Sequence, residues 1–258
     1  TTYNVENGHF ELEREASDEL FDNLSDSDVT IYPDFYVERN YTGADGAQKT
    51  LRIYHGRQTV NKPCLMSGSF PQSDTEIAID RMYADNNKIT PGDTIKLGDT
   101  VYTVSGLIAL TDYSTMFENN SDTMFDAINF SVALVTDSCF DGLKNSRITY
   151  NYAWTYNDGT PANDEAEKIR SDALSDDLVK AILKDNGGSE FAVAMGILSL
   201  GNEIREFTPR YTNQAITFSI EDIGGDRNMM FAFLCIMIVM ALQAGGTIFM
   251  VLASLQTE

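Results

Sequence analysis

The most regular alternation of polar and apolar residues lies in residues 94–97 and 100–104, on either side of Gly98-Asp99. A two-residue loop with glycine in first place is typical of a type II′ β-hairpin. The pattern therefore predicts a hairpin over residues 94–104. Gly106 comes just after it and is expected to form a β-bulge.

Several other segments are rich in β-branched and aromatic residues. The ranges are 29–37, 50–54, 75–79, 127–136 and 150–156. Pro33 predicts a bend or an edge position in the first range. The turn residues 43–46 predict a hairpin that leads into residues 50–54. In residues 127–136 we expect every other side chain to face the core.

Two shorter segments have the 3.6-residue spacing or the capping residue of a helix. Residues 11–26 carry apolar side chains at helical intervals with acidic residues between them, which predicts an amphipathic helix. Asp80 is placed to cap a short helix over residues 81–86. Residues 191–207 are less regular and fit either a helix or a strand.

A longer helix is predicted from Asn163 or Asp164, either of which can cap it, to about Lys184, before Gly187-Gly188. Its expected apolar face is Ala166, Ile169, Ala173, Leu178, Ile182 and Leu183. Local strand pairs with a few helices indicate an α+β fold of small mixed or antiparallel sheets. No internal repeat interrupts this pattern.

Residues 229–255 form an uninterrupted run without a charged side chain. As a helix they would extend about 40 Å, enough for a hydrocarbon core of about 30 Å. A buried core helix is the alternative, but such a helix normally keeps a polar face. We therefore predict two parts: a domain in residues 1–228 and a transmembrane helix in residues 229–255 that contacts membrane lipid.

The chain carries 39 acidic and 18 basic residues, for a net charge of −21. Each phosphate contact needs a Lys or Arg, so this balance argues against nucleic acid and against an anionic lipid surface. An acidic surface generally serves solubility, and the functional alternative is a cationic partner. A large acidic domain is more easily placed outside the cell, so residues 1–228 are expected to be extracytoplasmic.

No catalytic or metal-binding constellation is visible. His9 and His55 lack partners at the spacing of a zinc motif, and no phosphate-binding loop or nucleophile elbow occurs. Cys64 and Cys139 could form one bridge in an oxidising compartment, but nothing in the sequence requires it. The acidic clusters in residues 26–28, 158–167 and 172–177 could bind calcium but lack the spacing of a calcium-binding loop, and the two later ones are interpreted as a helix cap and a solvated helix face.

Four short motifs follow one another within residues 65–114. They are Gly68 followed by Pro71, a Glu-Ile-Ala-Ile strand at 76–79, Gly-Asp-Thr at 92–94 and Val-x-Gly at 104–106. The stretch DIGGDRNMMFAF at residues 222–233 then enters the apolar run. Together these features resemble the extracytoplasmic domain and second membrane helix of FtsX-like (MacB/LolC-type) ABC-transporter permeases.

The resemblance implies a permease with four or more membrane helices in the cell membrane of a bacterium. An outer domain that faces the medium fits a Gram-positive envelope, so a Gram-positive origin is expected. A separate ATP-binding subunit would hydrolyse ATP, and two permeases would form a dimer or heterodimer. Relatives export peptides or lipids, extract lipoproteins or drive cell-wall hydrolases. No catalytic residue, cofactor or metal is expected in this chain.

Two further expectations concern the rest of the gene. The chain starts at Thr1 without the features of a signal peptide and stops shortly after the apolar run, so we expect it to be part of a longer protein. The alternative function is a single-pass surface binding or sensor protein with an acidic ligand-binding outer domain. Additional membrane spans downstream would distinguish the permease from this alternative.

Overall fold

The computed structural model describes residues 3–24, 28–113, 116–118, 124–143, 147–185 and 204–209. The chain divides into two compact units, Thr1–Ile216 and Thr217–Glu258, and every described residue belongs to the first. The predicted transmembrane helix at 229–255 lies outside the described residues. Within those residues, no helix combines the length and the apolar character needed to cross a membrane.

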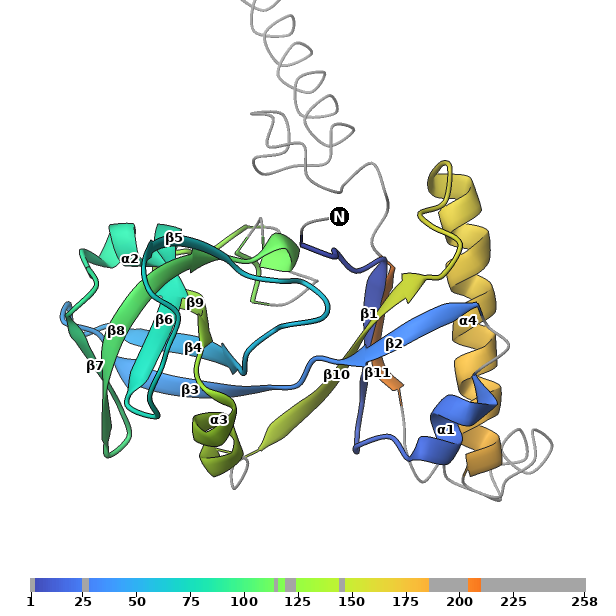
Figure 1. Ribbon diagram of the computed structural model, residues 1–258, viewed down its shortest axis with the longest axis horizontal. Coiled ribbons are helices and arrows are strands. Elements are labelled where there is room, and N and C mark those ends of the chain that lie inside the picture. The colour runs from blue at the N-terminus through green and yellow to red at the C-terminus, as the bar shows by residue number, and fades with distance from the viewer. Residues whose placement is uncertain are drawn as a thin grey trace, which may run out of the picture. The chain divides into compact units, whose positions relative to one another are not determined.

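Strands dominate the described part of the chain (Figure 1). The strands are β1 (Gly8–Leu12), β2 (Val29–Pro33), β3 (Tyr36–Thr42), β4 (Gln48–Tyr54), β5 (Cys64–Gly68), β6 (Glu76–Asp80), β7 (Thr94–Leu97), β8 (Thr100–Ala109), β9 (Phe130–Leu134), β10 (Ile148–Tyr156) and β11 (Ile204–Pro209). The helices are α1 (Asp18–Asn23), α2 (Arg81–Asn87), α3 (Asp137–Leu143), α4 (Asp164–Asp185) and the 3₁₀ turn η2 (Thr111–Tyr113).

These strands are connected in the order β11-β1-β10-β3-β4-β9-β6-β8-β5, with β2 also paired to β10 and β7 to β8. The pairs β4–β9 and β6–β8 are parallel, and the other pairs are antiparallel. Strand β10 joins the two halves of this arrangement, because it pairs with β3 near its start and with β1 and β2 further along. The described fold is α+β with a mixed sheet and few helices, as predicted.

The predicted hairpin is confirmed as β7–β8. Leu97 and Thr100 are register partners, and Gly98 between them has φ +62°, the positive value that a type II′ turn needs at this position. The predicted bulge is also present, since the β6–β8 register passes from Val104 to Gly106 and leaves Ser105 unpaired. The turn at residues 43–46 likewise joins β3 to β4, as expected.

Both predicted helix caps are observed. The Asp80 side chain accepts a hydrogen bond of 3.0 Å from the backbone N–H of Tyr83 and starts α2. Asn163 rather than Asp164 caps α4, because its Oδ1 accepts from the N–H of Ala166 at 2.9 Å. The longer helix α4 packs against α1 and β11 (Figure 1).

The helix predicted over residues 11–26 is wrong over its first half. Leu12 is the last residue of strand β1, and the helix there is limited to α1, Asp18–Asn23. Leu12, Leu20 and Leu24 are buried as their spacing suggested. The backbone of β1 pairs with β10 and β11, so tertiary hydrogen bonds override the local helical pattern.

Two predicted buried faces are also corrected. Strand β9 is buried on both sides: Phe130, Val132 and Leu134 face one core cluster, and Ala133 faces the other. This follows from its central position between β4 and β6. On α4, the predicted positions Leu178, Ile182 and Leu183 are buried, which confirms the second half of the predicted face. In the first half, Ile169 is 65% exposed while Glu167 and Ser171 are buried, so the inward face differs from the predicted one there.

The two described cysteines are free thiols. Cys64 lies at the start of β5, 3.5 Å from the hydroxyl of Tyr3, and Cys139 lies in α3, 3.7 Å from the hydroxyl of Tyr102. Each sulfur therefore has its own polar neighbour on a different element. The bridge considered from the sequence is not formed.

Candidate functional site: an acidic, tyrosine-lined cavity

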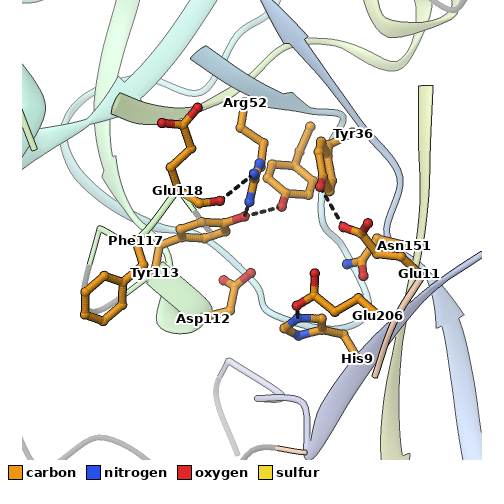
Figure 2. A pocket seen from close by; sticks show the side chains of 11 residues that line it. His9, Glu11, Tyr36, Arg52, Asp112, Tyr113, Phe117, Glu118, Asn151 and Glu206 are labelled. Atoms are coloured by element: carbon orange, nitrogen blue, oxygen red, sulfur yellow. Dashed lines mark hydrogen bonds and ion pairs between the residues drawn. The ribbon is translucent and has the colours of Figure 1, made fainter. Parts of the chain in front are cut away.

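A cavity of about 180 Å³ is lined by strands from both halves of the sheet and by the segment that follows β8 (Figure 2). Strands β1, β10 and β11 supply one wall, and β3, β4 and η2 with the residues after it supply the other. The lining residues are His9, Glu11, Tyr36, Arg52, Tyr54, Asp112, Tyr113, Phe117, Glu118, Asn151 and Glu206.

Three of these side chains form a row across neighbouring strands. Glu11 of β1 lies directly opposite Asn151 of β10 and directly opposite Glu206 of β11. Directly opposite residues place their side chains on the same face of a sheet, with Cβ atoms about 5 Å apart. Because like charges in such positions destabilise a sheet, the placement of Glu11 opposite Glu206 is electrostatically unfavourable.

Asn151 is the least satisfied member of the row. It is only 6% exposed, and its Oδ1 has no hydrogen-bond partner among the described residues. An unpaired buried amide oxygen costs about 1–3 kcal/mol. Its neighbour Glu11 accepts a hydrogen bond of 2.6 Å from the hydroxyl of Tyr36 through Oε1. Figure 2 shows Glu11 and Asn151 side by side at the cavity wall.

The opposite wall is a cluster of tyrosines around Arg52. The guanidinium of Arg52 lies 4.4 Å from the ring centre of Tyr36, donates to the hydroxyl of Tyr113 at 2.8 Å and is 2.6 Å from Glu38. The hydroxyls of Tyr54 and Tyr113 share a hydrogen bond of 2.7 Å. Burial raises the pKa of all three tyrosines, so they stay neutral near pH 7.

A buried ion network holds this wall in place. Arg57 donates to both oxygens of Asp34, at 2.9 and 2.7 Å, and to both oxygens of Asp112, at 2.8 and 2.7 Å. Burial, opposed by the charge of Arg57, raises the pKa of Asp34 to about 7. The three residues join the β2–β3 bend, the segment after β4 and η2, so the network fixes these elements relative to one another.

His9 supplies a positive charge beside the row. Its Nδ1 is 2.9 Å from Glu6 Oε1, and its Nε2 is 3.9 Å from Glu206 Oε1. Burial alone would lower the pKa of His9, but the carboxylates of Glu6 and Glu206 outweigh burial and raise it to about 10. His9 is therefore protonated near neutral pH and partly compensates the negative charge of Glu206.

The lining of the cavity carries more negative than positive charge, which favours a cation over an anion. Four carboxylates line the cavity against two cations when His9 is counted as protonated. No group of three or more His, Cys, Asp or Glu side chains in the described part of the chain is arranged to hold a metal ion. The arrangement offers hydrogen-bond acceptors on one wall and aromatic surface on the other.

Of the two histidines considered from the sequence, His9 lines the cavity and His55 lies elsewhere. His55 Nδ1 is 3.2 Å from Asp137 Oδ1. In the acidic clusters, Asp158 pairs with Arg170 at 2.8 Å and Asp172 with Lys168 at 2.5 Å, while residues 26 and 27 lie outside the described residues. Asp158 lies in the turn after β10 and Asp172 on the exposed face of α4, which agrees with their interpretation as solvated positions. Glu167, in the same cluster as Asp158, is instead buried and accepts a hydrogen bond of 2.9 Å from the hydroxyl of Tyr156.

The sequence pattern did not reveal the cavity residues. Glu11 was assigned to a helix, and Glu206 belonged to a segment that fitted either helix or strand. The one available signal was Asn151, a single amide within the aromatic strand Tyr-Asn-Tyr-Ala-Trp-Thr-Tyr at residues 150–156. The row depends on strands far apart in the chain, so no local motif encodes it.

The solved structures similar to this chain include two extracytoplasmic domains. One is the extracellular domain of the noncanonic ABC-type transporter YknZ from Gram-positive bacteria, with a TM-score of 0.38 and 12% identity over 77% of this chain and 100% of that one. The other is the periplasmic region of MacB from Actinobacillus actinomycetemcomitans, with a TM-score of 0.35 and 11% identity over 65% of this chain and 83% of that one. No protein-family model and no curated protein matches the sequence.

Proposed function

We propose that this chain is the extracytoplasmic domain and the following membrane helix of an FtsX-like ABC-transporter permease. Its role would be to transmit the movement of a separate ATP-binding subunit to a substrate or a partner in the cell envelope. The observation that carries the proposal is the set of motifs in residues 65–114, together with the uncharged run at 229–255. No catalytic residue is needed for such a role.

The motif positions have definite structural tasks, which supports the use of these motifs as a family signature. Gly68 and Gly106 are register partners on β5 and β8, where their backbones approach closely. Gly92 has φ +100°, and the next residue, Asp93, accepts from the backbone N–H of Thr90 at 2.7 Å. The motifs thus fall on positions that the β5–β8 unit restricts to particular residues.

The domain is also suited to transmit force, because its elements are tied by buried polar contacts as well as by apolar packing. The Arg57 network joins three separate segments. Lys49, 1% exposed, joins β4 to residues 128 and 129 through hydrogen bonds of 3.1 and 3.2 Å. A close-packed unit of this kind passes on strain with little internal yielding.

The test is to express the complete reading frame together with any neighbouring ATP-binding protein and to purify through a tag on this chain. We expect the ATP-binding protein to co-purify and to hydrolyse ATP. As a control, a variant of that protein in which the phosphate-binding lysine is replaced should co-purify but should not hydrolyse ATP. A frame without further membrane spans and without an associating ATPase would contradict the permease and leave the single-pass binding protein.

A further inference from the structure

The row formed by Glu11, Asn151 and Glu206 combines two energetically unfavourable features. The Oδ1 of Asn151 is buried without a partner among the described residues, and two carboxylates occupy directly opposite positions on β1 and β11. One kind of ligand relieves both, namely a cation that donates hydrogen bonds. We propose that this cavity binds a primary ammonium group. The proposal does not rest on the permease function.

The hydrogen-bond donors of a primary ammonium match the acceptors of the row in number and in charge. The ammonium has three N–H donors and no acceptor. The row presents the carboxylates of Glu11 and Glu206 and the amide oxygen of Asn151 from three adjacent strands. Charge-assisted hydrogen bonds of this type are shorter and stronger than neutral ones. The ammonium would therefore replace the repulsion between Glu11 and Glu206 with two attractive contacts.

The size and the far wall of the cavity suit an alkylamine. A volume of about 180 Å³ exceeds the roughly 150 Å³ of an apolar cavity that holds one benzene molecule. A short alkyl chain attached to the ammonium would lie against the aromatic side chains of Tyr36, Tyr113 and Phe117. Apolar walls with a few convergent polar groups are typical of small-molecule sites.

Other ligand classes fit less well. Calcium needs six to eight oxygens at about 2.3–2.6 Å, and the described residues contain no cluster suited to a metal ion. An anion would meet four carboxylates against the two cations His9 and Arg52. Among the described residues that line the cavity, Arg52 is the one guanidinium, and it is already engaged by Glu38, by the hydroxyl of Tyr113 and by the backbone oxygen of Glu118.

The ammonium could belong to a free small amine or to a lysine side chain, so the test uses a probe for each. Binding of 1,5-diaminopentane and of the blocked tripeptide acetyl-Gly-Lys-Gly-amide to the complete 258-residue chain is measured by titration calorimetry. We expect saturable one-to-one binding of at least one probe. Binding of the diamine alone would identify a small-molecule site, and binding of the peptide would identify a lysine side chain as the ligand.

Tetramethylammonium separates hydrogen bonding from charge, because it carries the same unit charge on nitrogen without any N–H group. We expect it to bind at least tenfold more weakly than the better amine. Equal binding would overturn the proposal, because it would show that the row's acceptors are not used. The absence of saturable binding of both amines to the folded chain would overturn it as well.

Variants locate the site. Glu11→Gln keeps an acceptor for the hydroxyl of Tyr36 but removes the charge, and Asn151→Leu removes the unpaired oxygen. Each should weaken amine binding about tenfold or more. The control Glu165→Gln makes the same charge change on the exposed face of α4 and should leave the affinity unchanged. Thermal unfolding checks that each variant folds, and an equal loss in the Glu165 control would contradict the assignment.

Discussion

Gly68 of β5 and Gly106 of β8 lie directly opposite each other, and neither position has room for a side chain. A Cβ on Gly68 would lie 2.3 Å from the backbone oxygen of Ser105, and a Cβ on Gly106 would lie 2.3 Å from the backbone oxygen of Ser69. Both obstacles are main-chain atoms, which cannot move aside as a flexible side chain can. The bulge at Ser105 and the close strand approach therefore require glycine at both positions.

The first prediction follows from this contact. Gly106→Ala should destabilise the domain by about 1–3 kcal/mol, because the added methyl group forces β5 and β8 apart. Gly142→Ala is the matched control, since a Cβ added at Gly142, in α3, would meet no described atom within 4 Å. Alanine there should be neutral or stabilising by up to about 1 kcal/mol. The urea dependence of unfolding measures both, and equal effects would contradict the packing argument.

The second prediction concerns the Arg57 network. Arg57→Met leaves Asp34 and Asp112 buried without their shared cation, so the free energy of unfolding should fall by about 3–5 kcal/mol. Lys168→Met breaks an exposed ion pair with Asp172 and should cost no more than about 1 kcal/mol. Chemical denaturation of both variants checks this. Similar losses would show that the burial of the network contributes nothing.

The third prediction concerns Lys49, whose amine lies in a buried position. Its Nζ is 2.9 Å from Asp45 Oδ2, 3.1 Å from the backbone oxygen of Ile128 and 3.2 Å from Asn129 Oδ1. Lys49→Met should lower the free energy of unfolding by about 1–3 kcal/mol, because these acceptors lose their donor. Lys180→Met changes an exposed lysine on α4 and should stay within about 0.5 kcal/mol. The midpoint of urea unfolding separates the two cases.

The fourth prediction concerns the pH dependence of stability. The pKa of His9 rises from 6.5 to about 10 in the folded domain, because Glu6 and Glu206 favour its protonated form and outweigh the opposing effect of burial. The contribution of protonated His9 to the free energy of unfolding is therefore fully present below pH 6.5 and is lost as the pH rises toward 10. The difference in free energy of unfolding between the native chain and His9→Gln isolates this contribution from other titrating groups. This difference in free energy of unfolding should decrease between pH 6.5 and pH 10.

A second variant checks the cause of this pH dependence. Glu6→Gln removes the nearest carboxylate from Nδ1 of His9, so the loss of the histidine contribution should move to lower pH. The proton uptake of His9 can be followed by NMR in the same samples. A His9 contribution that increased between pH 6.5 and 10 would contradict the sign of the argument.

Several elements of the fold follow from the sequence because their determinants are local. The β7–β8 hairpin is set by Gly98-Asp99, and α2 and α4 start at Asp80 and Asn163, whose side chains bond backbone groups three residues ahead. These interactions close within a few residues, so the pattern of the chain contains them. The membrane helix at 229–255 and the permease assignment remain predictions from the sequence.

The tertiary structure alone decided which polar residues meet. Glu11, Asn151 and Glu206 are far apart in the chain and come together because β1 pairs with β10 on one side and β11 on the other. Because of the same pairing, Leu12 lies in a strand and not in the helix predicted there. Hydrogen bonds between distant strands stabilise the fold as much as local ones do, but they produce no periodic pattern in the sequence. A site that depends on the register of such strands can therefore be recognised only in the folded chain.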